Sequence, residues 1–259
     1  MPPAVLDGVL MDASEATISV TDEGLLRGDG VFEVFPLYGG RPFGLDEHLA
    51  RMGRSAASIR LPLDLDAMRD DIATLIAEAG PGDAAVRVLA TRGGRRIALL
   101  EPIRDLPKTL RVATITYSPS RVLDGVKSLS YAANMLATRL AAEQGADQAL
   151  LVSPHGRVLE APTSSFFYVL DGSLYTPPLS DRILDSITRR MLFEVAEISE
   201  RVTTLDDLGS VSEAFLSSST HEVHPVSAID EIVLDPAPGP ITADASQRAR
   251  AHIEAALAQ

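Results

Sequence analysis

Lysine is the side chain whose placement is most informative in this sequence. The chain of 259 residues holds only Lys108 and Lys127 and no cysteine, so lysine, serine, threonine, aspartate and glutamate are the candidate nucleophiles. Lys127 lies between a turn-rich segment and a predicted helix, where we expect two lobes to meet. Desolvation there would lower the pKa of a lysine, which can then form an imine. Lys108 precedes a predicted strand and is expected in solvent, and a GC-rich genome would by itself explain the scarcity of lysine.

Three clusters of hydroxyl side chains indicate a site for phosphate. Thr163-Ser164-Ser165 and Ser217-Ser218-Ser219-Thr220 follow predicted strands, and Ser186-Ile187-Thr188 opens a predicted helix. Free N–H groups at a helix start favour a phosphate, although serine and threonine are also ordinary helix caps. Together with Lys127, and with Arg51 as a cation, the three clusters predict a phosphorylated cofactor.

Two other motifs carry less information. His221-Glu222-Val223-His224 precedes Pro225 in a predicted turn and lacks the helical spacing of a zinc motif, so no metal site is predicted. Gly28-Asp29-Gly30 lacks both the lysine of a phosphate-binding loop and the spacing of a dinucleotide-binding fold. A turn is the better interpretation of these glycines.

The composition excludes several classes of function. Lysine and arginine number 23 and aspartate and glutamate 36, and the resulting net charge of −13 argues against nucleic acid and anionic membrane partners. The absence of cysteine excludes disulfides, thiolate zinc sites and iron–sulfur clusters. The first residues do not resemble a signal peptide, and no apolar run is long enough for a membrane span. We therefore expect a cytoplasmic protein.

The elements that position these residues fall into two lobes, which predicts an α+β fold. In the first lobe, Asp7-Gly8 predicts a hairpin, and apolar residues at helical spacing predict helices from Leu45 to Ile59 and from Leu65 to the stop at Gly80-Pro81. The strands expected in this part of the chain cover 31–38, 85–91 and 110–117.

A turn-rich linker at residues 116–125 separates the second lobe. In that lobe we expect helices at 131–144, 186–199 and 242–258. The expected strands cover 148–152, 157–159, 166–170, 173–175 and 214–217.

Six segments, taken in order, carry a resemblance to a known family: RGDGVFEV, FGLDEHLARMGRSA, VKSLSYAANMLATRLAAEQGADQALL, GRVLEAPTSSFFYV, LYTPPLSDRILDSITRRML and FLSSSTHEVHPV. They resemble class IV (fold type IV) pyridoxal-phosphate enzymes, which include branched-chain aminotransferases, D-amino acid aminotransferases, (R)-amine transaminases and aminodeoxychorismate lyases. The resemblance implies a small N-terminal α/β domain (1–116), an interdomain loop (117–125) and a larger C-terminal pseudo-barrel domain (126–259). It also implies a homodimer in which the partner subunit completes each site.

The resemblance assigns roles to residues of this chain. It makes Lys127 the catalytic lysine, which forms a Schiff base with pyridoxal 5'-phosphate (PLP) and moves the substrate proton. Glu160 matches the carboxylate that keeps the pyridine nitrogen protonated, so that the ring accepts electrons. Arg51 matches the arginine that holds the cofactor phosphate. The further cofactor-binding residues that the resemblance implies are Thr163, Ser164, Leu184, Ile187, Thr188, Ser219 and Thr220.

The sequence also departs from the family pattern. Ser165 stands where the family usually has asparagine, and Tyr131 follows Lys127 by four residues, where branched-chain members have a tyrosine at the fifth. Arg27 stands where many D-amino acid and lyase members have an aromatic residue. The best-known D-amino acid enzymes have a histidine a few residues after the turn that is Thr91-Arg92-Gly93 here, and this chain has none there. Binding of a substrate carboxylate calls for arginine, with its two-pronged donor geometry. The predicted substrate-binding residues are Arg27, reaching from the partner subunit, Phe32, Arg92, Arg95 and Tyr131, and the alternative is that the arginines are surface charges.

The predicted activity is transfer of an amino group from a D-amino acid to a 2-oxo acid through a Lys127 Schiff base. One alternative is an aminodeoxychorismate lyase, which releases pyruvate and 4-aminobenzoate. Another is a branched-chain L-amino acid aminotransferase, which alanine at position 132 disfavours. A non-catalytic homologue is disfavoured because Lys127, Glu160 and Arg51 are all present.

Overall fold

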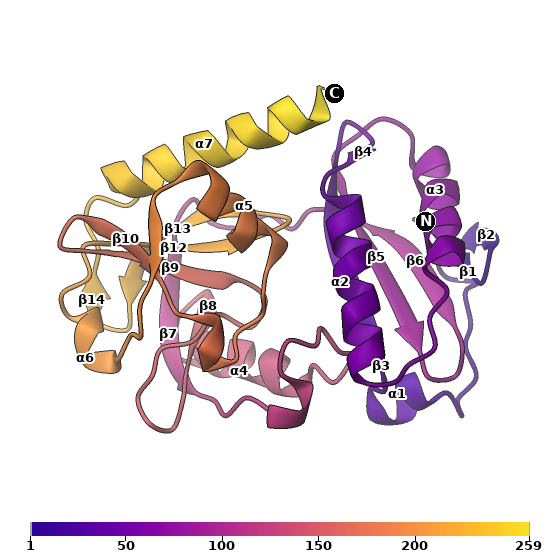
Figure 1. Ribbon diagram of the computed structural model, residues 1–259, viewed down its shortest axis with the longest axis horizontal. Coiled ribbons are helices and arrows are strands. Elements are labelled where there is room, and N and C mark those ends of the chain that lie inside the picture. The colour runs from indigo at the N-terminus through magenta and orange to yellow at the C-terminus, as the bar shows by residue number, and fades with distance from the viewer. Residues whose placement is uncertain (1, 259) are drawn as a thin grey trace. The chain divides into compact units, whose positions relative to one another are not determined.

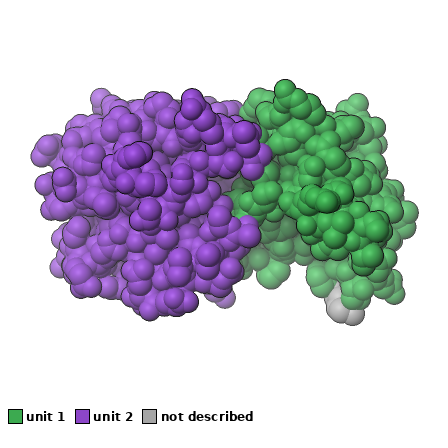
Figure 2. All heavy atoms as spheres, turned by 90° about the horizontal axis from the view of Figure 1, so that it is seen from below, with its two compact units in different colours: residues 1–104, 126–131 green, residues 105–125, 132–259 purple. Residues whose placement is uncertain are grey.

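The computed structural model describes residues 2–258 and shows two compact units (Figures 1 and 2). The N-terminal unit comprises the chain up to Arg104 together with Val126–Tyr131. The C-terminal unit comprises Asp105–Gly125 and the chain from Ala132 onward. Both units mix helices with a sheet, which confirms the predicted α+β class. Among the described residues, no helix combines the length and the hydropathy that a membrane span requires.

The N-terminal unit is built on a six-stranded antiparallel sheet with the strand order β2-β1-β6-β5-β3-β4. Helices α2 and α3 lie along this sheet (Figure 1), and their apolar residues share a core with it. The elements of the unit are β1 (Pro3–Leu6), β2 (Val9–Asp12), α1 (Glu23–Arg27), β3 (Gly30–Tyr38), β4 (Arg41–Pro42), α2 (Leu45–Ser58), α3 (Leu65–Ala79), β5 (Ala84–Thr91) and β6 (Arg96–Glu101).

The two long helices of this unit form where the periodicity predicts them. Asp64 caps α3 by accepting a hydrogen bond from the backbone N–H of Ala67 at 2.9 Å, and Gly80 ends the helix. Leu49 and Met52 of α2 share one core with Ile72 of α3 and with the inner face of the sheet. The hairpin at Asp7-Gly8 and the strand from residue 31 are confirmed as well.

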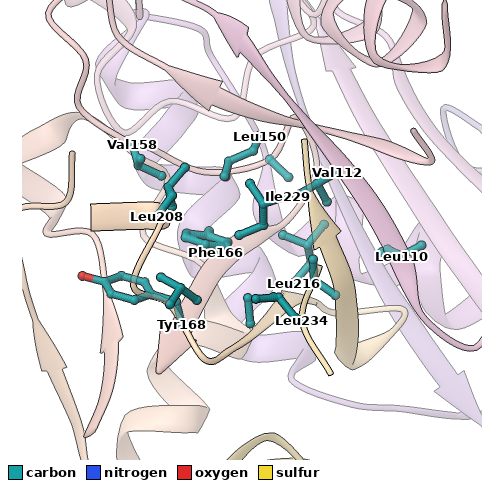
Figure 3. Packing of buried hydrophobic residues seen from close by; sticks show 14 of the residues in the cluster. Leu110, Val112, Leu150, Val158, Phe166, Tyr168, Leu208, Leu216, Ile229 and Leu234 are labelled. Atoms are coloured by element: carbon teal, nitrogen blue, oxygen red, sulfur yellow. The ribbon is translucent and has the colours of Figure 1, made fainter. Parts of the chain in front are cut away.

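The C-terminal unit contains an eight-stranded mixed sheet with the order β11-β10-β9-β12-β13-β7-β8, and β14 pairs with β13. Aliphatic and aromatic side chains, among them Phe166, Tyr168 and Leu216, fill one core of this unit (Figure 3). Its elements are β7 (Leu110–Thr116), η1 (Arg121–Leu123), α4 (Ala132–Glu143), β8 (Gln148–Val152), β9 (Ser165–Leu170), β10 (Ser173–Thr176), η2 (Leu179–Asp181), α5 (Ile187–Val195), β11 (Ile198–Glu200), α6 (Leu205–Leu208), β12 (Glu213–Ser218), β13 (Glu222–Ile229), β14 (Ile232–Val233) and α7 (Pro240–Leu257).

The observed elements differ from the predicted ones at several points. The helix predicted over 186–199 ends at Val195, and residues 198–200 form β11, which pairs in parallel with β10. The four residues from His221 to His224 are not all in a turn, because β13 begins at Glu222. Neither α1 nor β6 was predicted.

The division of the chain also differs from the predicted domain bounds of 116 and 126. Strand β7 pairs in parallel with β8 and β13, and it therefore belongs to the C-terminal unit. The segment Val126–Tyr131 returns to the N-terminal unit, where Ser128 forms a bridge pair with Val31 of β3. Lys127 thus belongs to the N-terminal unit.

Candidate active site

Three hydrogen bonds within the N-terminal unit hold the backbone of the segment from Lys127 to Leu129. The N–H of Phe32 donates to the carbonyl of Lys127 at 3.1 Å, and the N–H of Leu129 donates to the carbonyl of Gly30 at 2.9 Å. The N–H of Lys127 donates to the hydroxyl of Ser55 on α2 at 3.2 Å. The short segment around Lys127 therefore continues the antiparallel pairing along β3.

The amine of Lys127 lies over an aromatic pair. Its Nζ is 4.4 Å from the centre of the Phe32 ring and 5.7 Å from that of Tyr131. The two rings meet edge to face, with their centres 5.2 Å apart. A cation within about 6 Å of a ring face is attracted by the ring quadrupole, so the two aromatic residues fix the position of the amine. The structure thus places Phe32 and Tyr131 beside Lys127, and their predicted role in substrate binding stays a prediction.

Arg87 also lies beside Phe32, and the sequence analysis missed it. Its guanidinium carbon is 5.7 Å from the centre of the Phe32 ring. Arg87 lies opposite Val34 in the β3–β5 register, so it shares a sheet face with Phe32. Glu101 of β6 accepts hydrogen bonds from its Nε and Nη2 at 2.7 and 2.9 Å. The available signal was an arginine inside the apolar strand sequence AAVRVLAT.

The arginines that the sequence predicts for substrate binding each form an ion pair inside the N-terminal unit. Arg92 donates to Asp29 through Nε and Nη2, at 2.7 and 3.2 Å, and it also donates to two backbone carbonyls at the end of α2. Arg27 pairs with Glu23 one helical turn earlier. Arg95 pairs with Asp7 at 2.6 Å.

Residues 92–95 form a tight turn between β5 and β6. Arg95, a predicted substrate-binding residue, lies at the end of this turn. The substrate-binding role of Arg27, Arg92 and Arg95 stays a prediction.

Arg51 belongs to a buried polar cluster between α2 and β3. Its Nε donates to Oε1 of Glu33 at 2.7 Å and its Nη2 to Oε2 at 2.6 Å, while His48 Nδ1 lies 2.8 Å from Oε2. Burial raises the pKa of Glu33, but the hydrogen bonds from Arg51 and His48 and the charge of Arg51 outweigh that effect and lower this pKa to about 2. Burial lowers the pKa of His48, and the charges of Arg51 and Lys127 add to the decrease.

Glu160 lies in the C-terminal unit. It ends a segment that follows β8 and returns alongside it. The N–H of Leu151 donates to the carbonyl of Glu160 at 2.8 Å, and Glu160 Oε1 accepts a hydrogen bond from the N–H of Leu184 at 3.0 Å. Tyr117 follows β7. Burial raises the pKa of Tyr117, and the nearby charge of Glu160 raises it further. Two predicted cofactor residues, Glu160 and Leu184, are therefore in contact.

The predicted hydroxyl clusters lie at the start of α5 and after β12. The Ser186 hydroxyl caps α5 by accepting from the N–H of Arg189 at 3.3 Å, which leaves Ile187 and Thr188 in the first turn, where backbone N–H groups have no helical acceptor. Thr188 Oγ1 lies 3.5 Å from the hydroxyl of Ser219, so two of the three clusters meet here.

The third cluster lies in the turn that follows Glu160. The N–H of Ala161 donates to the carbonyl of Ser164 at 2.8 Å, and Asn134 of α4 donates to the carbonyl of Pro162 at 3.1 Å. Thr163 at the tip of this turn is exposed. Ser165, at the position where the family usually has asparagine, is buried, and its hydroxyl makes no hydrogen bond to any described residue.

The two histidines of the His221–His224 stretch lie close together in the C-terminal unit. Their ring centres are 6.0 Å apart, and the backbone carbonyl of Pro107 accepts from His224 Nε2 at 2.7 Å. The hydroxyl of Thr220 lies 3.0 Å from His221 Nδ1. Across residues 2–258, no group of three or more His, Asp or Glu side chains could hold a metal ion.

Comparison with known proteins identifies the family. The model of the amino-transferase class IV family matches residues 30–229. A putative branched-chain-amino-acid aminotransferase of Methanocaldococcus jannaschii is 34% identical over 256 residues, covering 89% of this chain and 88% of that protein. A D-alanine aminotransferase of Listeria monocytogenes is 33% identical over 265 residues, covering 92% and 91%. The PLP-bound structure of a hypothetical aminotransferase from Mycobacterium tuberculosis has a TM-score of 0.88 at 28% identity, covering 98% of this chain and 99% of that one.

The chain therefore belongs to the class IV aminotransferases, which depend on PLP. The donor set of the two units fits this cofactor chemically. The N-terminal unit offers an amine over aromatic rings and a buried arginine. The C-terminal unit offers a carboxylate and a helix start beside hydroxyl groups.

Proposed function

We propose that the protein transfers the amino group of a D-amino acid to a 2-oxo acid. PLP supplies an electron sink for the carbon that loses its proton. Lys127 provides the amine that binds the cofactor aldehyde and moves the substrate proton. The cofactor contacts in this proposal include Lys127 and Arg51, which belong to the N-terminal unit, and Glu160, which belongs to the C-terminal unit.

Each of the remaining cofactor contacts has a chemical reason. The Glu160 carboxylate, oriented by the N–H of Leu184, would keep the pyridine nitrogen protonated. Arg51, the first turn of α5 and the hydroxyls of Ser219 and Thr220 would bind the phosphate, because N–H groups at a helix start and a guanidinium both favour anions. Thr163 and Ser164 complete the proposed set in the turn after Glu160.

The observation that carries the proposal is the shared position of Lys127 and Arg87 on the Phe32 ring. An amino acid presents its amine and its carboxylate a few ångströms apart, and a guanidinium suits the carboxylate. We propose that Arg87 binds the substrate carboxylate while Lys127 acts on the amine-bearing carbon. Arg27, contributed by the partner subunit of a homodimer, would be a second cation for this carboxylate.

The role of Lys127 is tested by borohydride reduction of the PLP-loaded protein. Because the chain has only two lysines, mass spectrometry of its peptides can assign the fixed cofactor without ambiguity. We expect the label on Lys127, and none in Lys127→Ala, which should also lose transamination. Lys108→Ala is the matched control and should keep the label and the activity. A label on Lys108, or full activity of Lys127→Ala, would refute the assignment.

The substrate class is tested by mixing the purified holoenzyme with single amino donors and following PLP spectrally. We expect D-alanine to convert the bound PLP faster than L-leucine does. Transamination of branched-chain L-amino acids is the second candidate activity, because the M. jannaschii relative is named a putative branched-chain-amino-acid aminotransferase. L-leucine as the faster donor would establish this activity, and release of pyruvate from aminodeoxychorismate would establish the lyase.

The role of Arg87 is tested by comparing donors with and without a carboxylate. Arg87→Gln should raise the KM for D-alanine by about tenfold or more, the loss expected when a charge-assisted hydrogen-bond pair is removed. The KM for an (R)-amine, which has no carboxylate, should stay within about twofold on the same scale. Arg69→Gln, at an exposed ion pair with Asp46, is the control. Equal effects of Arg87→Gln on both donors would exclude the carboxylate role.

A further inference from the structure

Glu33 is a fully buried carboxylate that the proposed function does not use. It lies on β3 next to Phe32, and because successive strand residues point to opposite faces, it faces α2 while Phe32 faces Lys127. Helix α2 presents His48, Arg51 and Ser55 at spacings of three and four, which is one helical face, and all three are buried. On this face, His48 Nδ1 and the Arg51 guanidinium contact Glu33, and the Ser55 hydroxyl accepts from the backbone N–H of Lys127.

The contact between Glu33 and Arg51 fixes the plane of the guanidinium. Nε and Nη2 of Arg51 donate to separate oxygens of the carboxylate, at 2.7 and 2.6 Å. A two-pronged contact of this kind leaves the planar guanidinium no freedom to rotate about its last bond. A single hydrogen bond or a surface position would leave that freedom.

His48 forms a further hydrogen bond with Glu33 without adding charge. Burial and the charges of Arg51 and Lys127 lower the pKa of His48, so the imidazole is neutral at pH 7. Since a carboxylate only accepts, Nδ1 of His48 carries the proton and donates to Oε2 at 2.8 Å. The ring packs beside Phe35, with 5.5 Å between the ring centres.

We propose that Glu33, supported by His48, is a positioning residue that orients Arg51 toward the phosphate of PLP. The inference rests on the proposed role of Arg51 in phosphate binding. Glu33 touches neither substrate nor cofactor in this proposal and acts through the guanidinium alone. A buried carboxylate that only held the fold together would contribute equally to binding of a cofactor with and without a phosphate.

The test compares the dissociation constants of PLP and of pyridoxal, which lacks the phosphate, by the visible absorbance of the bound cofactor. Four proteins are compared: wild type, Glu33→Gln, Arg51→Lys and the double variant. Glutamine keeps the shape but replaces one acceptor oxygen by an NH₂ group that faces a donor. We expect Glu33→Gln to lower the preference for PLP over pyridoxal about tenfold or more when Arg51 is present, and less than about threefold in the Arg51→Lys background.

The outcomes distinguish a failure of the positioning role of Glu33 from a failure of the phosphate-binding role of Arg51. An equal loss of preference in both backgrounds overturns the positioning role of Glu33. An unchanged preference in Arg51→Lys overturns instead the assignment of Arg51 to the phosphate. The ³¹P resonance of bound PLP gives a readout independent of activity: it should shift toward that of free PLP in Glu33→Gln, and an unshifted resonance contradicts the proposal.

Pyridoxal binding and the melting temperature of the apo protein show whether Glu33→Gln is folded. If it is not, His48→Phe takes its place, because this change removes one donor to Glu33 and keeps a ring beside Phe35. That variant should lower the preference for PLP by about threefold or more, and an unchanged preference overturns the proposal.

Discussion

Phe32 and Glu33 are adjacent in the chain and serve opposite sides of one strand. The ring of Phe32 carries the amine of Lys127 and the guanidinium of Arg87, and the carboxylate of Glu33 binds Arg51 and His48. The Phe32 ring is buried and the side chains of Lys127 and Arg87 are partly exposed, while Glu33, His48 and Arg51 are all buried between α2 and the sheet. At the scale of single residues, one strand therefore places the amine of Lys127 and the charges of the Glu33 cluster on opposite faces.

The buried carboxylate makes stability depend on pH in a defined direction. The pKa of Glu33 is about 2 in the folded protein against an ordinary value of 4.5, so its ionised form stabilises the fold above pH 4.5 and this contribution is lost as the pH falls toward 2. The contribution is on the order of 3 kcal/mol. In urea unfolding of the apo protein, we expect wild type to exceed Glu33→Gln in stability by about 3 kcal/mol or more at neutral pH, because glutamine leaves the buried Arg51 without its counter-charge. The difference should shrink steadily below pH 4.5.

The exposed Glu47, on the same helix as Arg51, gives the matched control. Glu47→Gln should follow the wild-type stability curve over the whole pH range. A gap between wild type and Glu33→Gln that stays constant down to pH 3 would contradict the ionised state of Glu33.

At the scale of elements, the position of Lys127 depends on how closely a third segment approaches β3. Residues 127–129 pair with β3 on one edge while β5 pairs on the other, and Gly30 lies between them at the start of β3. A Cβ at Gly30 would lie 2.4 Å from the carbonyl oxygen of Ala90 and 2.6 Å from Leu129 Cδ1. Only glycine permits this approach of three backbones.

Gly30→Ala should therefore displace the segment that carries Lys127. We expect a loss of about 1–3 kcal/mol in the free energy of unfolding, as for other overpacked positions, together with a lower kcat. Gly82→Ala is the control, because no heavy atom lies within 4 Å of a Cβ built there. Wild-type stability and kcat in Gly30→Ala would show that Lys127 does not depend on this contact.

The elements that the sequence predicts correctly are those with a strong local signal. Helices α2 and α3 have long apolar periodicity, and the hairpins at Asp7-Gly8 and Asp171-Gly172 have their turn residues. Strand β11 was missed because three residues next to a helix have no pattern of their own, and its pairing partner β10 lies more than twenty residues earlier. Strand β6 begins with Arg96, whose charge suggested a loop, but Asp71 of α3 binds that charge at 2.9 Å.

At the scale of the whole molecule, some residues of the candidate site can be found from sequence motifs, and others can be found only from the pairing of strands. Lys127, Glu160 and the α5 start follow from six ordered motifs. Arg87 has no motif and gains its position from the β3–β5 register and from the return of residue 127 to β3, both of which are long-range contacts. Ion pairing likewise decides the surroundings of Arg92, because Asp29 lies 63 residues away in the sequence.

The assembly of two chains is the remaining prediction, and α1 is the element that tests it. Leu25 and Leu26 of α1 are 59% and 57% exposed, an unusual state for two adjacent leucines beside the proposed substrate cation Arg27. We expect sedimentation to give twice the 27.6 kDa mass of one chain. Leu25→Glu combined with Leu26→Glu should yield single chains that still melt cooperatively but transaminate slowly, because each site lacks the partner's Arg27. Val233→Glu, at an exposed valine of β14, should stay dimeric. Full activity in a verified monomer would show that Arg27 has no role across the interface.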